Sequence, residues 1–396
     1  MLLMLGFAAS AAAAEFGKPG GPVPARIDEV LSVLRQDPYV MEMLISYGTS
    51  KGGSAGHLAL AIRDPAQADD TVYSANFYAD RSEQHSSGFY TAELMTAIPK
   101  REYLFQTASH LGDTAQFGLD FGEVYKRSVV GVRVYGVPQL ERDKLVAFFQ
   151  RINDDYHRRA SKTEYHGHEI VYDYMNLNCA KTIGAGFKYG ADYADLDVKS
   201  GALFYGVDAL AARHANLPTE MAVKLMKEWD ARGYRMDTVL YTKYAGSTYV
   251  DPHEEKKVAF KDLPNRFPSV LSFDFRAEEG RYEDYDNLFA MYLLYNLGKY
   301  GVKVNGQTGA LELEKLGRTL PYARAVEVAA AGAQEDSNGF LARLVRPARG
   351  RTFDGLADNS GIKGGTDTAP VNALPPPQAQ ASQAQASEAP ASQAGR

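Results

Sequence analysis

Cysteine is almost absent from this chain, since Cys179 is the only one among 396 residues. A single cysteine excludes an intramolecular disulfide. In an oxidising compartment, a solitary thiol is either buried and inert or kept for its reactivity. Cys179 also lies too far from the N-terminus to be a lipoprotein anchor. This thiol is therefore the first group to consider for chemistry.

The chain also lacks a net positive charge, and long apolar runs are scarce in it. The formal net charge is −6 and the isoelectric point is about 5.8. These values argue against a nucleic-acid partner, which would require a basic face. No segment after the N-terminus approaches the run of about 20 apolar residues that spans a membrane. Residues 287–302 come closest and indicate a buried core helix, with a membrane-facing amphipathic helix as the alternative.

The two ends of the chain differ in composition from its middle. Residues 1–14 are apolar and end in Ala-x-Ala, which predicts a signal peptide, although the usual basic start is missing. Residues 366–396 are rich in Ala, Gln, Ser and Pro, and such a tail is expected to be disordered. Between the two ends we expect a catalytic domain over 24–190 and an annex of unclear type over 191–350. The mature protein is thus predicted to be exported, soluble and periplasmic.

Hydrophobic periodicity predicts the main elements of the folded part. Residues 57–63 and 71–79 suit the two strands of a hairpin, and a helix opened by Pro138 should run to residue 157. The other expected helices cover 25–36, 219–232 and 286–299, and the other expected strands cover 102–107, 124–136 and 237–244.

Asn178-Cys179 fits the start of a further helix. Asn is a strong N-capping residue, and Cys179 would then lie in the first turn. The helix dipole and the unpaired N–H groups lower the pKa of a thiol there, and a nearby imidazolium lowers it further. The backbone N–H of Cys179 could form one arm of an oxyanion hole. The alternative is that Cys179 is a small buried hydrophobic residue and that Asn178 serves only as a cap.

Gly56-His57 opens the first strand of the predicted hairpin, and His57 is the candidate base for the thiol. With the turn centred near residue 67, position 57 faces roughly position 77. On the paired strand, Ser74, Asn76 or Tyr78 could orient the imidazole, and Asn76, which lies nearest to that position, is the predicted orienting residue. The alternatives are a histidine satisfied at a strand edge and a polar residue on a solvated strand face.

A zinc site is another alternative for the same cysteine. His166-Gly-His168 places two imidazoles on one side of an extended segment, and together with Cys179 they could ligate zinc. A fourth ligand is not evident in the sequence. We therefore expect neither a metal nor another cofactor.

Papain-like folds usually run cysteine first and then histidine. This chain instead runs Gly56-His57-Leu-Ala-Leu early, then a strand and a helix, and Tyr172-x-Tyr-x3-Asn178-Cys179-Ala late. This order resembles the circularly permuted papain-like enzymes, which include permuted NlpC-type hydrolases and relatives of lecithin retinol acyltransferase. More narrowly, residues 40–190 resemble the Lnb N-terminal periplasmic domain family, which is named for a bacterial lipoprotein transacylase. The resemblance implies Cys179 as the nucleophile and His57 as its base.

The expected fold class is accordingly α+β. It comprises a permuted papain-like core, whose antiparallel sheet packs on the cysteine-bearing helix, and a C-terminal mixed α/β annex. The expected function is a cysteine hydrolase or acyltransferase that acts on an amide, ester or thioester of the bacterial cell envelope. Peptidoglycan peptides and lipoprotein acyl groups are the candidate substrates, with peripheral membrane contact among the expected interactions. The alternative is a non-catalytic envelope binding or scaffold protein that retains the fold.

Overall fold

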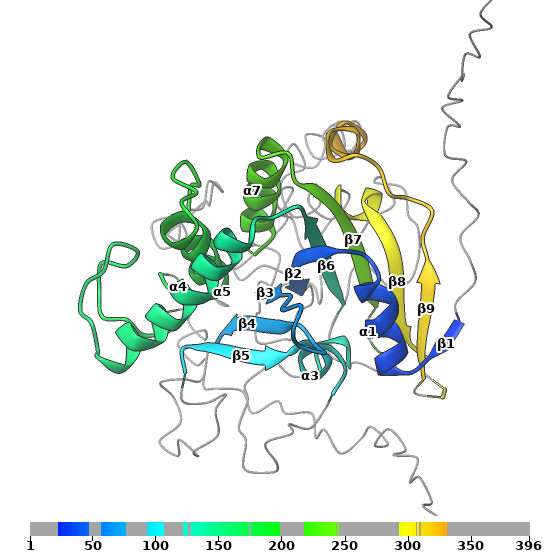
Figure 1. Ribbon diagram of the computed structural model, residues 1–396, viewed down its shortest axis with the longest axis horizontal. Coiled ribbons are helices and arrows are strands. Elements are labelled where there is room, and N and C mark those ends of the chain that lie inside the picture. The colour runs from blue at the N-terminus through cyan, green and yellow to red at the C-terminus, as the bar shows by residue number, and fades with distance from the viewer. Residues whose placement is uncertain are drawn as a thin grey trace, which may run out of the picture. The chain divides into compact units, whose positions relative to one another are not determined.

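A mostly antiparallel sheet organises this protein, as the computed structural model shows in Figure 1. The described strands follow the order β1-β9-β8-β7-β6-β2-β3-β4-β5. Neighbouring strands pair antiparallel except for β7 and β8, which are parallel. The chain is therefore an α+β protein. The structure describes residues 23–46, 57–76, 93–106, 122–125, 128–173, 176–198, 218–242, 244, 293–305, 307–308 and 310–330, all within a compact unit of residues 1–363.

The elements have the following bounds. The strands are β1 (Val23–Ala25), β2 (Tyr39–Ser46), β3 (His57–Ile62), β4 (Thr71–Ala75), β5 (Met95–Pro99), β6 (Val129–Tyr135), β7 (Arg235–Thr242), β8 (Gly298–Val304) and β9 (Leu311–Lys315). The helices are α1 (Ile27–Arg35), α3 (Lys100–Phe105), α4 (Gln139–His157), α5 (Cys179–Ala185) and α7 (Pro218–Ala231). A 3-10 turn, η1 (Glu123–Tyr125), and a π-helical turn, η2 (Gly186–Gly190), complete the named elements, and residues 293–296 and 322–330 are also helical.

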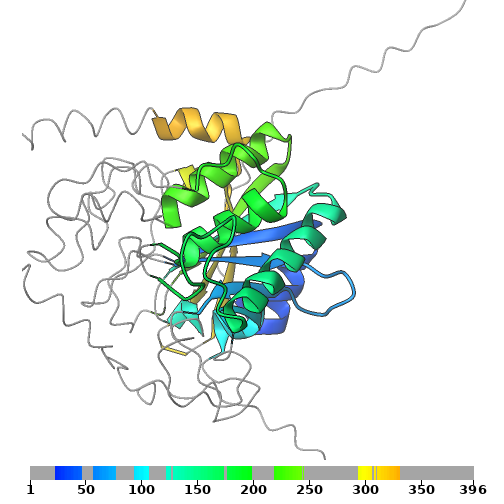
Figure 2. The ribbon, with the colours of Figure 1, turned by 90° about the vertical axis from the view of Figure 1, so that its left-hand side faces the viewer.

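The sheet buries both of its faces, each in a separate apolar cluster. Successive side chains of a strand point to opposite faces, so alternate residues of β2 and β3 belong to different clusters. Leu58 and Leu60 pack with residues of α4, α5 and α7, and we name this side the α5 face. Ala59 and Ala61 pack with residues of α1 and α3, and we name this side the α1 face. Figure 2 shows the helices of the α5 face (green) lying together.

Charged groups are buried on the α1 face. Lys100 is fully buried, and its ammonium contacts the carboxylate of Glu42 and, at 3.3 Å, the hydroxyl of Tyr39. The other oxygen of Glu42 accepts a hydrogen bond from Tyr241 at 2.9 Å. Burial alone lowers the pKa of Lys100, but Glu42 and the neighbouring tyrosines raise it well above its ordinary value. Gly131 makes room for this cluster, because a Cβ atom there would lie 1.8 Å from Glu42 Oε1.

Most of the predicted elements are confirmed within the described residues. The hairpin is formed by β3 and β4, and the predicted helices at 25–36, 139–157 and 219–232 correspond to α1, α4 and α7. The predicted strand at 237–244 corresponds to β7.

Three of the predicted segments are corrected by the structure. Residues 102–105 of the predicted strand at 102–107 lie in a helix, because α3 begins at Lys100, directly after Pro99 ends β5. The segment 124–136 is divided between η1 and β6. The expected helix at 286–299 ends at residue 296 in its described part, and β8 begins at Gly298.

The sheet also runs through the region predicted to be an annex. Strands β7, β8 and β9 lie after residue 190, and β7 pairs with every residue of β6. The sheet itself therefore does not divide at residue 190. The predicted signal peptide, the predicted tail and Gly56 lie outside the described residues. Among the described helices, none has the length and apolar character needed to cross a membrane.

Candidate functional site

Cys179 is the first residue of α5, as the sequence predicts. Asn178 is the N-cap, with an extended backbone (φ −94°, ψ −176°), and its side chain accepts a hydrogen bond from Lys181 N at 3.0 Å. Its carbonyl accepts the next helical bond, from Thr182 N, at 2.9 Å. The thiol therefore lies at the positive end of a capped helix, where a negative charge is favoured.

The surroundings of Cys179 are largely apolar. The residue is 5% exposed and belongs to the same cluster as Leu58, Leu60 and Ile183. Helix α5 packs against β3 and β4, so the cysteine-bearing helix does lie on the strand that begins with His57. Burial among apolar groups opposes the thiolate, whereas the helix end favours it.

His57 lies at the start of β3 and is 8% exposed. Its ring nitrogen Nε2 is 2.7 Å from the hydroxyl of Ser74, which is fully buried on β4. Val72 of the same strand packs on the α1 face, and alternation along β4 sets Ser74 on that face too. The imidazole is thus bound on the α1 face of the sheet.

His57 and Cys179 therefore approach the sheet from different sides. Alternation along β3 directs His57 to the same face as Ala59 and Ala61, whereas Cys179 packs on the α5 face. His57 is the terminal residue of its strand. A direct pair requires the imidazole to reach the thiol around the end of β3.

Asn76, the predicted orienting residue, lies just after β4 and is 2% exposed. The β3–β4 register pairs Leu60 with Tyr73, and its continuation puts position 76 opposite His57. The side-chain amide of Asn76 donates to Glu93 O at 3.3 Å, and its backbone N–H donates to Leu94 O at 2.7 Å. These contacts tie the end of β4 to the start of the next described segment.

A second buried polar pair lies beside His57. Ser46, the last residue of β2, is directly opposite His57 in the β2–β3 register. Its hydroxyl donates to Glu123 Oε2 at 3.1 Å, and Glu123 is fully buried. The α1 face thus carries an imidazole, hydroxyl groups and a carboxylate at one end of neighbouring strands.

His166 and His168 lie in the segment that leads to α5. Their rings are 5.8 Å apart. Burial lowers the pKa of His166, and the charges of Lys181 and His168 lower it further. No group of three His, Cys, Asp or Glu residues in the described segments could hold a metal ion. Because His166, His168 and Cys179 are all described, the structure does not support the zinc alternative.

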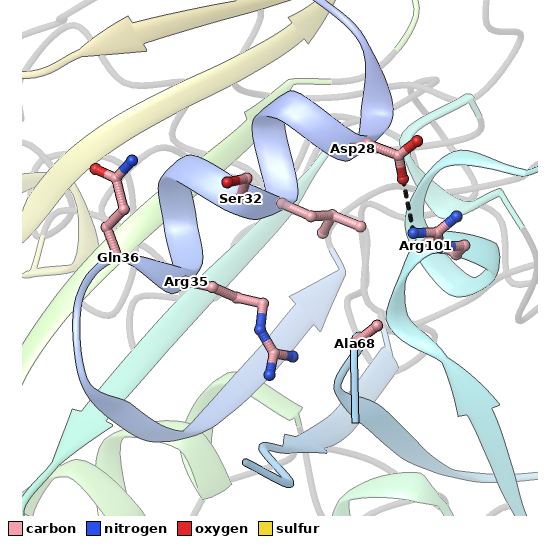
Figure 3. Close-up of a pocket in the computed structure, with 7 residues that line it drawn as sticks. Asp28, Ser32, Arg35, Gln36, Ala68 and Arg101 are labelled. Carbon is pink, nitrogen blue, oxygen red and sulfur yellow. Dashed lines mark hydrogen bonds and ion pairs between the residues drawn. The ribbon is translucent and has the colours of Figure 1, made fainter. Parts of the chain in front are cut away.

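The described pocket lies elsewhere, beside α1, with a volume of about 370 Å³ (Figure 3). Its two arginines are already engaged within the chain. Arg101 pairs with Asp28 at 2.7 Å, and Arg35 pairs with Asp70 at 2.5 Å. Neither Cys179 nor His57 lines this pocket, so we do not assign it to the candidate site. Its lining consists of Asp28, Leu31, Ser32, Arg35, Gln36, Ala68 and Arg101.

Comparisons with protein-family models, curated proteins and solved structures find no match to this chain.

The sequence offers Ser74 as one of three candidates for the orienting residue but favours Asn76, whereas His57 is hydrogen-bonded to Ser74. Ser74 lies two positions before Asn76 on the same strand. The hairpin pattern alone therefore places it diagonally across from His57. Glu123 has no such signal, because it reaches Ser46 from a segment 77 positions away. A distant contact of this kind depends on the order of strands in the sheet.

Proposed function

We propose that this protein is an exported cysteine-dependent hydrolase or acyltransferase that acts on an amide, ester or thioester of the bacterial cell envelope. In this proposal, residues 24–190 form a permuted papain-like core, Cys179 is the nucleophile, and His57 takes and returns the proton. Peptidoglycan peptides and lipoprotein acyl groups are the proposed substrates.

One observation carries the proposal: the only thiol of the chain is the first residue of a capped helix that packs on the strand of His57. The positive end of the helix stabilises a thiolate relative to a thiol. Lys181, two positions further along α5, adds a positive charge in the same turn.

The proposed reaction proceeds in two steps. The Cys179 thiolate attacks the carbonyl carbon of the substrate, and backbone N–H groups at the helix start stabilise the oxyanion. The leaving group departs with the proton that the imidazole held. Water or an amine then attacks the thioester, and the thiol is released again. Attack by water gives hydrolysis, and attack by an amine gives acyl transfer.

A non-catalytic envelope binding or scaffold protein is the second candidate function. It is favoured by the placement of His57 on the α1 face, opposite the apolar cluster that encloses Cys179. A cysteine so enclosed acts as a small hydrophobic side chain. In this case the fold is kept and the thiol has no chemical role.

Alkylation of the native protein distinguishes the two functions. Because Cys179 is the sole thiol, iodoacetamide modification measured by mass spectrometry reports on this residue alone. The rate is measured from pH 5 to pH 10, with protein unfolded in urea as the reference. A catalytic thiol reacts in the native state with an apparent pKa well below the usual value of about 8.5. Reaction only after unfolding would reject the enzyme and leave the scaffold function.

Variants of the histidines identify the partner of the thiol. We expect His57→Gln to raise the apparent thiol pKa, and His157→Gln, which removes an exposed histidine paired with Glu93, to leave it unchanged. Equal profiles for wild type and His57→Gln would exclude His57 as the base even if the thiol is reactive.

A further inference from the structure

A short hydrogen bond joins His57 to Ser74. Nε2 of His57 and Oγ of Ser74 are 2.7 Å apart, within the usual range for such a bond. The two residues are diagonal neighbours across β3 and β4 on the α1 face, a separation that longer side chains can bridge. Ser74 is fully buried within a paired strand, so its hydroxyl is held in place.

We infer that Ser74 is the positioning residue of the His57 imidazole, in the role that the sequence predicts for Asn76. The inference rests on the proposed function, because a positioned imidazole matters for chemistry only if Cys179 is a nucleophile. Asn76 instead holds the chain after β4, through its contacts with Glu93 O and Leu94 O.

The Ser74 hydroxyl can accept from Nε2–H or donate to an unprotonated Nε2, and the first arrangement is the one that suits a base. If Nε2–H donates to the serine hydroxyl, then Nδ1 is unprotonated and can accept a proton. The same hydroxyl continues to accept from Nε2–H when the ring becomes an imidazolium. A serine hydroxyl can therefore hold the ring through both protonation states of a base. The bond also fixes the ring plane, and the position of Nδ1 follows from it.

Nitrogen NMR of histidine-labelled full-length protein tests the positioning directly. The His57 signals are assigned by their loss in His57→Gln. We expect wild type to show the Nε2–H tautomer, Ser74→Ala to lose this preference, and Ser74→Thr, which keeps a hydroxyl, to restore it. Asn76→Ala is the matched control and should leave the tautomer unchanged. An Nδ1–H tautomer in wild type, or an equal loss in Asn76→Ala, would overturn the inference without any need for a folded Ser74→Ala.

The thiol readout separates this inference from the proposed function. If Ser74 positions a working base, Ser74→Ala should move the pH–rate profile for native alkylation of Cys179 up by about one unit, which slows the reaction about ten-fold at pH values well below the thiol pKa. If the wild-type thiol reacts only after unfolding, the proposed function fails, and the NMR result still decides whether Ser74 holds the imidazole. A reactive wild-type thiol whose rate is unchanged in Ser74→Ala would contradict the inference alone.

Discussion

The side chain of Lys100 shows how strongly single residues of the α1 face depend on their partners. Its ammonium group is fully buried and lies between Glu42, Tyr39 and Asp70. The desolvation cost of a buried charge is offset only while its partner is present. The cluster therefore stabilises the fold only while it is complete. Removal of one charged member leaves the other buried without its partner, and its desolvation cost is then no longer offset.

We predict that Lys100→Met lowers the free energy of unfolding by about 3–5 kcal/mol, because it leaves Glu42 buried without its cation. Urea denaturation at pH 7 measures the change. Lys144→Met is the matched control, because Lys144 pairs with Asp192 at 2.5 Å on the surface. Such exposed pairs contribute at most about 1 kcal/mol. Similar losses in both variants would show that the burial of Lys100 has no energetic weight.

At the scale of the element, α5 depends on its N-cap. The helix has seven residues before it passes into η2, and its first turn lacks an acidic residue that could interact with the dipole. The bond from Lys181 N to the Asn178 side chain is thus the main local support of the turn that carries Cys179.

We predict that Asn178→Ala lowers the free energy of unfolding by about 1 kcal/mol, whereas Asn178→Ser, which can cap equally well, changes it by only a few tenths. Urea denaturation again measures the difference. The alanine variant should also raise the apparent pKa of the Cys179 thiol if the first turn frays. An alanine variant as stable as wild type would mean that the cap does not hold this helix.

The elements differ in how far the sequence could predict them. Helices α4 and α7 are long enough for a 3.6-residue period to be evident, and the β3–β4 hairpin has a clear turn. The apolar run Tyr103-Leu-Phe105 is too short for its periodicity to distinguish a strand from a helix. In the structure it belongs to the helix α3. The position of Cys179 at a helix start could be predicted from Asn178 alone, because Asn is a strong N-capping residue. Which face of β3 the helix would cover depends on contacts far apart in the sequence, so the face of His57 could not be predicted.

At the scale of the whole molecule, the sheet joins segments that composition alone separates. Arg133 of β6 pairs with Asp237 of β7 at 2.6 Å and with Asp37, just before β2, at 3.2 Å. Lys299 of β8 also reaches Asp37, at 2.8 Å. These ion pairs link strands from both sides of residue 190. We therefore expect the described part to unfold as one cooperative unit rather than in two steps.

Half-buried tyrosines give this unit a characteristic dependence on pH. Burial, and after it the charge of Asp230, raise the pKa of Tyr322 to about 12. Burial and then a hydrogen bond to Glu141 raise the pKa of Tyr234 to about 12 as well. A raised pKa means that the folded state keeps its proton while the unfolded state loses it. The stability that these groups contribute is complete below pH 10 and is lost as pH rises from 10 towards 12.

We predict a steep loss of the free energy of unfolding above pH 10, measured by urea denaturation at intervals from pH 8 to pH 11. Tyr322→Phe should reduce this loss, because one shifted group is removed. At pH 7 the same variant should be as stable as wild type or more stable, since the buried Tyr322 hydroxyl has no hydrogen-bond partner among the described residues. Tyr234→Phe provides the contrast, because it breaks a 2.8 Å bond to Glu141 and should lower stability at pH 7. A flat stability profile above pH 10 would contradict the raised pKa values.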